Sequence, residues 1–423
     1  MNKILFKNGL VYYHQKLSPL DVLVEGDTIK AIEETIIDKE AQVIDLKGKL
    51  LTHSFIDIHV HLREPGFEYK ETVATGTKSA LYGGYSHIVA MANTLPCMDD
   101  EEAIERFEQI VAKDACVHTY TYSAITKGLA GNELVKMKDN LHHAIVVGFS
   151  DDGKGVQSDA MMKAAMTEAK ALDSIIVAHC EDESELKPGG CVHDGRYAKE
   201  HALIGINNES EFKQVARDLD IVRTVHNRYH VCHVSTRQTV DLLRKAKAEG
   251  LPVSGEVSPH HLVLTDENIK NCDPNYKMNP PLRSKEDREA LIRGLNDGTL
   301  SVIATDHAPH SDEEKERPIS KAPFGIIGLQ HCFPLIYTYV VKTGETTLET
   351  VLEAMSVTPA KVLNLPIEFE VGSKANLCVF DLEEEFIIKK EDIVSKASNT
   401  PFIGYPCYGK IKYNMIEGKL TEF

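Results

Sequence analysis

Short apolar runs alternate with amphipathic stretches through the middle of the chain. Eight apolar runs stand at 55–61, 87–91, 117–123, 144–149, 174–179, 230–234, 253–257 and 300–305. Hydrophobic residues at helical spacing predict helices between them, for example at 159–172, 209–227, 236–249 and 285–296. The repeated order of strand and helix predicts an α/β fold with a parallel sheet, and eight strands close a (β/α)8 TIM barrel. An open doubly wound sheet fits the same alternation and is the alternative.

The two ends of the chain have a different pattern. Short β-rich runs punctuated by turn residues occur at 3–13, 21–24 and 42–45, and similar runs return at 374–380 and 409–417. We therefore expect both ends to form one small β-sandwich-like domain. The predicted division assigns 1–52 together with 366–423 to this β domain and 53–365 to the barrel.

Composition narrows the class of protein. The 423 residues include 64 acidic and 47 basic side chains, a formal charge of −17, which argues against a nucleic-acid partner. With 42% hydrophobic and 26% charged residues and no apolar run near the roughly 20 residues of a membrane span, disorder and membrane insertion are excluded. The start of the chain lacks a secretory pattern and the nine cysteines form no CxxC pair, so we expect reduced thiols and a cytoplasmic location.

The first barrel run carries a candidate metal-binding pair, His59 and His61. Side chains alternate along a strand, so four apolar residues are expected on one face and four polar ones on the other: Ile56, Ile58, Val60 and Leu62 against Asp57, His59, His61 and Arg63. Two imidazoles on one face can hold one metal ion. By itself a His-x-His pair is equally typical of packed or surface histidines.

Further candidate ligands follow the ends of other apolar runs. They are Asp151 and Asp152 after the fourth run, His179 at the end of the fifth, His233 at the sixth and Asp306 after the eighth. In a barrel these strand ends meet at one rim, where active sites are built. Four histidines and two carboxylates suit zinc, and a carboxylate can bridge two ions. Taken singly, each histidine is more often structural and Asp-Asp-Gly is usually a turn.

Seven short motifs together resemble the dihydroorotase family of the amidohydrolase superfamily, in its longer bacterial type. They are His59-Val60-His61-Leu62-Arg63-Glu64-Pro65-Gly66, Asn93-Thr94, Asp151-Asp152-Gly153, Ala178-His179-Cys180-Glu181, Pro259-His260-His261-Leu262, Asn279-Pro280-Pro281-Leu282-Arg283 and Ala304-Thr305-Asp306-His307-Ala308-Pro309-His310. The resemblance runs through almost the whole chain. Departures from the family pattern at 53–55, 86–87 and 91–94 flank the functional residues without replacing any.

The resemblance implies a metal-dependent TIM barrel with two Zn2+ per subunit. It implies that one ion is held by His59, His61 and Asp306, and the other by His179 and His233. A carboxylate from the Asp-Asp-Gly segment would bridge the ions; Asp151 and Asp152 compete for that part, and the family's interval to the next histidine favours Asp152. Hydantoinases and allantoinases usually use a carboxylated lysine instead. Lys154 lies nearby but comes after the turn, so a lysine bridge is the lesser alternative here.

The implied reaction is reversible hydrolysis of dihydroorotate to N-carbamoyl-aspartate, a step of pyrimidine synthesis. Asp306 would accept the proton of the attacking water and pass it to the departing ring nitrogen. Arg63 shares the predicted strand face of His61 and would bind the substrate carboxylate. By resemblance the substrate is also contacted by His61, Asn93, Asn279, His310 and the backbone of Phe324 and Gly325.

Several other residues need a separate interpretation. We expect Cys180, Cys232 and His307 to face away from the metals, because each is adjacent in sequence to a proposed ligand. His260 and His261 could support the ligands or serve packing, and His53 and His87 are expected to be structural.

The resemblance does not settle the partner proteins, and alternative functions remain. It implies a homodimer and allows association with aspartate carbamoyltransferase. The alternatives in function are a hydantoinase or allantoinase, or a catalytically silent scaffold that binds aspartate carbamoyltransferase.

Overall fold

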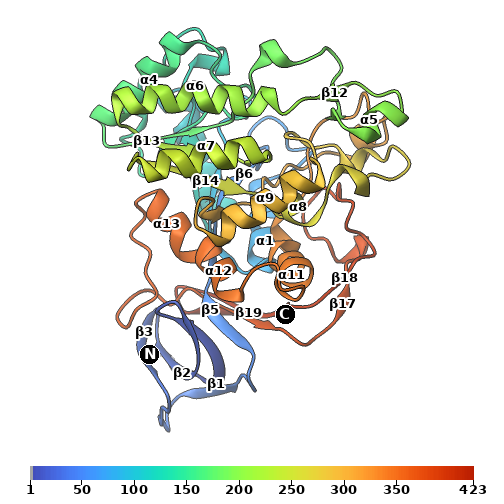
Figure 1. Cartoon of the computed structure of the whole chain (residues 1–423). Helices are drawn as coiled ribbons and strands as arrows, with labels where there is room; N and C mark the ends of the chain where they lie inside the picture. The colour runs from blue at the N-terminus through green and yellow to red at the C-terminus, as the bar shows by residue number, and fades with distance from the viewer. Residues whose placement is uncertain (1–2) are drawn as a thin grey trace.

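The computed structural model describes residues 3–423, and it contains two eight-stranded sheets. One sheet forms a barrel surrounded by helices, and the other lies beneath it and contains strands from both ends of the chain (Figure 1). Within 3–423, no helix has the length and apolar character needed to cross a membrane.

The barrel strands follow one another in chain order without reversal. They are β6 (Phe55–Val60), β7 (Tyr85–Ala90), β8 (His118–Ser123), β9 (Val146–Phe149), β10 (Ile175–Ala178), β13 (Arg228–Val231), β14 (Val253–Val257) and β15 (Val302–Ile303). Neighbouring strands pair in parallel, and a parallel bridge between Val60 and His307 joins the last strand segment to the first. The predicted TIM barrel is confirmed, and the open doubly wound sheet is excluded because its strand order reverses.

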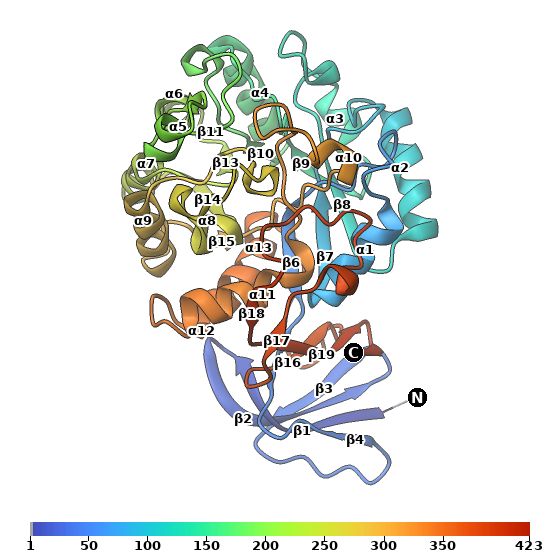
Figure 2. The same cartoon turned by 90° about the vertical axis from the view of Figure 1, so that its right-hand side faces the viewer.

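Helices cover the outside of the barrel (Figure 2). The longer ones are α1 (Val73–Tyr82), α2 (Glu101–Asp114), α4 (Asp159–Ala171), α6 (Glu209–Val225), α7 (Arg237–Ala248) and α9 (Lys285–Asn296). The four helices expected from periodicity are thus present, with ends within two residues of the prediction. Ser158, Thr236 and Ser284 begin α4, α7 and α9, and each side chain accepts a hydrogen bond from a first-turn N–H.

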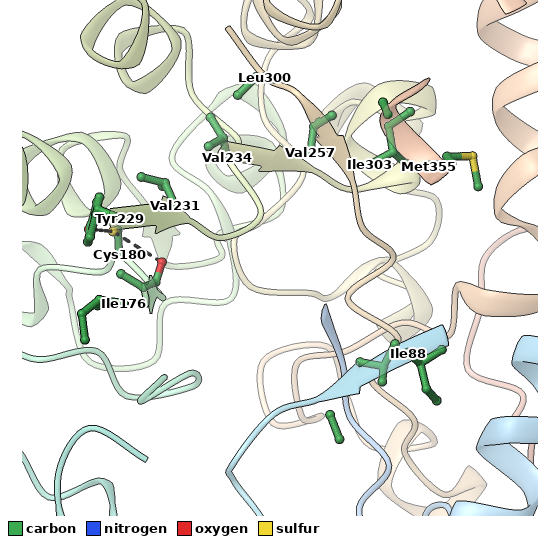
Figure 3. Close-up of a cluster of buried hydrophobic side chains, with 14 of the residues drawn as sticks. Ile88, Ile176, Cys180, Tyr229, Val231, Val234, Val257, Leu300, Ile303 and Met355 are labelled. Carbon is green, nitrogen blue, oxygen red and sulfur yellow. Dashed lines mark hydrogen bonds between the residues drawn. The ribbon is translucent and has the colours of Figure 1, made fainter. Parts of the chain in front are cut away.

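The barrel strands are apolar on both faces. Figure 3 shows part of the layer between strands and helices, with Ile88, Ile176, Val231, Val257 and Ile303 on five different strands. A second cluster is formed by residues of the opposite faces and fills the interior: Ile56, Ile58, Val89, Tyr122, Ile175, Val177 and Val302. Burial on both faces explains why the strands appear in the sequence as continuous apolar runs.

The simple alternation expected along β6 is wrong in detail. Ile56 and Ile58 belong to the interior cluster, whereas Val60 and Leu62 pack in the layer beneath the helices. The pairing of β6 with β7 shifts register between Asp57 and Val60, and this irregularity reverses the faces. His59 and His61 therefore owe their shared direction to the segment after the shift.

Both chain ends contribute to the second sheet, as expected. Its order is β20-β19-β16-β5-β1-β2-β3, with β4 beside β1. The bounds are β1 (Lys3–Tyr13), β2 (Lys16–Glu25), β3 (Thr28–Glu33), β4 (Gln42–Asp45), β5 (Leu50–His53), β16 (Leu377–Asp381), β19 (Lys410–Ile416) and β20 (Lys419–Glu422). This sheet has its own apolar core, built from residues such as Phe6, Val22, Ile29 and Leu377. The residue boundaries given above for the two domains remain a prediction.

Three aromatic rings connect the two sheets. Phe55 of β6, Phe380 of β16 and Phe333 of α11 (Cys332–Ile336) are fully buried, and their ring centroids lie 4.4 to 5.5 Å apart. Because one ring comes from the barrel strand and another from the terminal sheet, this cluster fixes the two sheets relative to each other.

We expect Phe333→Ala to lower the free energy of unfolding by about 3–5 kcal/mol, since it leaves a cavity in this cluster. The measurement is the denaturant midpoint of the purified variant beside Ile387→Ala, whose side chain is 52% exposed and whose loss should change little. Equal stability of the two variants would show that the aromatic cluster does not support the junction.

Candidate metal centre and active site

Four histidines and two aspartates meet at the carboxyl ends of the barrel strands. His59 lies in β6 and His61 directly follows it, Asp152 follows β9, His179 follows β10, His233 follows β13 and Asp306 follows β15. Each of the six residues is buried, with at most 5% of its surface exposed. The structure thus brings together all six candidate ligands expected from the strand ends.

Asp152 lies at the centre of this cluster. Its Oδ1 is 3.5 Å from His59 Nε2, 3.4 Å from His179 Nδ1 and 3.5 Å from His233 Nε2. Its Oδ2 lies 3.5 Å from His61 Nε2. One carboxylate therefore faces four histidines from three segments of the chain, which is the geometry a bridging ligand requires.

Asp306 closes the cluster from the last strand. Its Oδ1 is 3.0 Å from His61 Nε2 and 3.4 Å from His59 Nε2. Burial alone would raise the pKa of Asp306, but the imidazoles of His59 and His61 outweigh burial and lower that pKa to about 2. The carboxylate is therefore ionised, and it can accept either a cation or a proton.

Asp151 does not face the histidines as Asp152 does. Its carboxylate accepts hydrogen bonds from the backbone N–H groups of Ile125 and Thr126, at 2.7 and 3.1 Å, and from the Thr126 hydroxyl. These bonds anchor the loop after β8 and direct Asp151 away from the histidines. Lys154 is exposed, whereas the cluster is buried, so its side chain lies outside the cluster as well.

The donor set fits divalent metal. His59 Nε2 and Asp152 Oδ1 are buried and have no hydrogen-bond partner, although they face each other. Two facing acceptors with no hydrogen between them are satisfied by a cation. Ligand atoms of one tetrahedral zinc lie about 3.3–3.4 Å apart, close to the separations in this cluster. Two overlapping groups have suitable spacing: His59, Asp152 and His233, and His59, His61 and Asp306.

The backbone around the cluster takes up unusual conformations. Arg63, His233 and Asp306 have positive φ angles of 63°, 30° and 47°. Such angles are uncommon outside glycine and concentrate at functional sites, where surrounding contacts must hold them.

Five residues of the cluster, all except His59, line a cavity of about 330 Å³. Every residue expected to contact substrate lines the same cavity. The lining includes His61, Arg63, Asn93, Asp152, His179, His233, Asn279, Asp306, His310, Phe324 and Gly325. Residues separated by more than 260 positions in the chain thus share one wall.

Arg63 and His310 form the polar side of this cavity. Arg63 Nε donates to the Pro309 carbonyl at 3.2 Å, and its terminal nitrogen lies 3.4 Å from His310 Nε2. His310 Nε2 donates to the Phe324 carbonyl at 2.8 Å. Burial and the adjacent Arg63 guanidinium hold the pKa of His310 well below its usual range, so this imidazole is neutral. Within 3–423, Arg63 makes no salt bridge with a carboxylate.

Two asparagines are held in defined orientations. Asn93 Oδ1 lies 3.0 Å from His61 Nδ1, and Asn93 Nδ2 donates to the Asp152 carbonyl at 3.3 Å. Asn279 Nδ2 donates to both carboxylate oxygens of Glu181 at 3.1 Å. Because its amide hydrogens are engaged in this way, Asn279 is left with Oδ1 as a free acceptor.

Gly325 is held from both sides. Its N–H donates to the Lys277 carbonyl at 3.0 Å, and its carbonyl accepts from Asn399 Nδ2 at 3.1 Å. Its φ is 150°, and a Cβ at this position would lie 2.5 Å from the Ala308 carbonyl oxygen. Only glycine therefore fits here, and both of its polar backbone groups already have partners inside the protein.

Two of the three expected outward-facing residues do face away. Cys180 Sγ lies 3.3 Å from Tyr229 Oη beneath the helices (Figure 3), and His307 Nε2 lies 3.3 Å from Glu71. The expectation for Cys232 is wrong, because its sulfur lies with His59 and Glu256 in a group whose ligand atoms are within 4.8 Å. β13 ends at Val231, so strand alternation no longer applies at Cys232.

The remaining extra histidines have packing contacts. His261 Nε2 donates to the Pro280 carbonyl at 3.0 Å, and both ring nitrogens of His260 are buried without partners. His53 Nδ1 donates to the Ser54 carbonyl, and His87 contacts Ser86 and stacks on His118. These contacts agree with the expectation that His53 and His87 are structural residues.

Sequence reasoning missed three residues that support the site. Glu256 contacts His59, Glu181 holds Asn279, and Asn399 ties the His310 backbone to the Gly325 loop. Glu181 was within a motif, so its position offered a clue. Glu256 interrupts an apolar strand run, which indicates a buried charge with a task. Nothing in the sequence around Asn399 distinguishes it from a loop residue.

Comparison with known proteins identifies similar chains. A family model described as "Dihydro-orotase-like" matches residues 48–239. The chain is 46% identical over 420 residues to a dihydroorotase of Staphylococcus epidermidis, covering 99% of this chain and 98% of that protein. It is 47% identical over 419 residues to a dihydroorotase of Listeria monocytogenes, with the same coverage.

Solved structures with the same fold include hydantoinases. The L-hydantoinase (dihydropyrimidinase) of Arthrobacter aurescens superposes with a TM-score of 0.90 at 26% identity, covering 100% of this chain and 96% of that chain. A D-hydantoinase from Thermus sp. gives a TM-score of 0.84, also at 26% identity, with 99% and 94% covered.

The contrast between the paired aspartates can be tested directly. Asp152→Asn removes the central charge, so we expect it to lose most bound divalent metal while the fold is retained. Asp151→Asn weakens the loop anchor and should cost about 1–3 kcal/mol of stability but leave metal content unchanged. Elemental analysis and thermal melts of both variants give the answer; full metal content in Asp152→Asn would show that Asp152 is not a ligand.

Proposed function

The chain belongs to the dihydroorotase family and is a hydrolase acting on cyclic amides, and on that premise we propose that it interconverts dihydroorotate and N-carbamoyl-aspartate with two zinc ions. This reaction belongs to pyrimidine biosynthesis, in which the ring-closing direction is required. The family relationship supports the substrate, and the buried histidine–aspartate cluster supports the metals.

The observation that carries this proposal is the unpaired guanidinium of Arg63 in the cavity wall. It lines the same cavity as five of the six metal-site residues, and a half-buried cation without a carboxylate partner favours an anionic ligand. Dihydroorotate supplies a carboxylate next to its cyclic amide, so one molecule can satisfy both parts of the cavity. Arg63 would bind that carboxylate through two parallel hydrogen bonds.

We assign the ligands as the geometry suggests. His59, His61 and Asp306 would hold one ion, His179 and His233 the other, and Asp152 would bridge them. When bound, the two ions would polarise the amide carbonyl and lower the pKa of the attacking water towards neutrality.

Asp306 would carry the proton through the reaction. Water adds its oxygen to the ring carbonyl carbon, and its proton moves to the Asp306 carboxylate. When the carbon–nitrogen bond breaks, the same proton moves from Asp306 to the departing nitrogen. The reverse sequence closes the ring, and Asp306 begins and ends each cycle ionised, as its lowered pKa requires.

The remaining cavity residues would orient the ring. Asn93 would complete the carboxylate contacts beside Arg63, with His61 at the border between substrate and metal. Neutral His310 has a single N–H, which donates to the Phe324 carbonyl, so the contact expected from His310 requires that bond to be exchanged for one to the substrate. Asn279 would accept an N–H of the ring through its free Oδ1. The Gly325 N–H is engaged with Lys277, so the backbone contact to the ring edge expected there falls chiefly to Phe324.

The cell location and partners are extensions of the same proposal. We assign a cytoplasmic enzyme with a small-molecule substrate and no nucleic-acid or membrane partner. A homodimer and an association with aspartate carbamoyltransferase remain predictions from family resemblance. Hydantoinase or allantoinase activity is the alternative reaction, because the hydantoinases share the barrel fold, and a silent scaffold is the alternative without catalysis.

A substrate panel separates these possibilities. We expect zinc-loaded protein to hydrolyse dihydroorotate well above hydantoin and allantoin, and chelator-stripped protein to be inactive. Arg63→Met should keep its metal but lose about 2–5 kcal/mol of substrate binding, which raises KM by roughly 30- to 4,000-fold. Arg196→Met, at an arginine whose side chain is 85% exposed, is the control. Preference for hydantoin, or an unchanged KM in Arg63→Met, would refute the assigned substrate.

The proton path gives a second prediction. Asp306→Asn keeps the side-chain shape and one oxygen, but the amide cannot accept and return the proton. We expect turnover to fall about 10²–10⁴-fold or more while dihydroorotate still binds. Turnover, metal content and substrate affinity should be measured on one preparation; near-normal turnover with both metals present would leave Asp306 a ligand only.

A further inference from the structure

We propose that Glu256 is a positioning residue that couples the two metal groups, because one of its oxygens contacts a candidate ligand from each. The inference rests on the proposed two-metal function but not on the identity of the substrate. Glu256 lies in β14, and its side chain is completely buried.

The contact with His59 determines which ring nitrogen faces the metals. His59 Nδ1 lies 2.6 Å from Glu256 Oε1. A carboxylate only accepts hydrogen bonds, so Nδ1 carries the hydrogen and Nε2 keeps its lone pair. That lone pair points towards Asp152 and Asp306, the two carboxylates of the cluster. Glu256 therefore makes His59 a ligand through Nε2 and increases the basicity of that nitrogen.

The same oxygen holds the backbone of His233. The His233 N–H donates to Glu256 Oε1 at 3.0 Å, and the Val234 N–H donates to the Glu256 carbonyl at 2.9 Å. His233 has a φ of 30°, a strained value that requires support. These two bonds hold the backbone in place and aim the imidazole at Asp152. Loss of the Glu256 side chain would thus remove one of the two bonds that hold the His233 backbone, as well as the bond to His59.

The second oxygen fixes Glu256 itself. His230 Nε2 donates to Glu256 Oε2 at 3.0 Å, and the Ser254 hydroxyl lies 2.7 Å from His230 Nδ1. His230 and Ser254 face each other on the paired strands β13 and β14. The rigid sheet therefore sets the position of the carboxylate, and the carboxylate sets the positions of two ligands that belong to different ions.

The test compares two substitutions with a matched control. Glu256→Ala removes every side-chain contact, so zinc affinity should fall on the order of 10- to 100-fold at both sites. Glu256→Gln keeps one acceptor oxygen for His59 and His233, so it should retain both ions with weaker affinity. The control is Glu211→Gln. Glu211 is buried and accepts hydrogen bonds from Ser235 and Thr236, in the loop that contains His233, so this substitution should lower stability but keep wild-type zinc affinity.

Metal stoichiometry at buffered free zinc and the visible spectrum of the cobalt-loaded protein are the readouts. Weakening of both ions, with an altered cobalt spectrum in Glu256→Gln, supports the coupling. Wild-type affinity in Glu256→Gln with an unchanged spectrum, or loss of a single ion in Glu256→Ala, overturns it. If Glu256→Ala does not fold, the glutamine variant decides alone. A wild-type protein that binds two zinc ions but does not hydrolyse dihydroorotate would refute the substrate and leave this inference standing.

Discussion

Closure of the parallel sheet into a ring is the constraint on which the site depends. His59 lies in the first barrel strand, His61 directly follows it and Asp306 follows the last strand, so they meet only when these strands are neighbours. The closing contacts lie directly at the ligands: the His61 N–H donates to the His307 carbonyl, and the Thr305 N–H donates to Asp57. Folding of the barrel and assembly of the candidate metal centre are therefore one event.

The closed barrel brings several buried charged side chains together, and the residues around them offset the cost of burying these charges. Isolated buried carboxylates and imidazoles are costly unless paired or hydrogen-bonded. Here Glu256, Asn93 and Glu181 each engage a candidate ligand or substrate residue, and Asp151 anchors a neighbouring loop. The lone pairs of His59 Nε2 and Asp152 Oδ1, which are aimed into the centre, are left unsatisfied. The residues around the cluster thus determine which lone pairs face its centre, and a bound cation would satisfy those lone pairs.

The C-terminal segment has a part in the site as well as in the terminal sheet. After β16 the chain returns across the barrel, where Ser395 and the Lys396 N–H bond to Glu71, and Glu71 contacts His307. Asn399 then links the His310 backbone to the Gly325 loop. The last strands β19 and β20 complete the terminal sheet. The C-terminal segment therefore stabilises the cavity from outside the barrel, through contacts with residues next to the candidate ligands.

Periodicity and residue type were enough to predict the barrel, its long helices and the six candidate ligands, because parallel strands are buried on both faces and their carboxyl ends share one rim. Periodicity and residue type could not tell that Asp152 faces the histidines while Asp151 anchors a loop. That difference depends on the contact of Asp151 with Thr126, a residue 25 positions away in the chain. The face of Cys232 was mispredicted because alternation ends with β13, and the faces of β6 because its register shifts. Glu256 and Asn399 support the site only through contacts between segments that are distant in the sequence. Local pattern specifies the elements and where they end; the tertiary structure decides which polar groups then face one another.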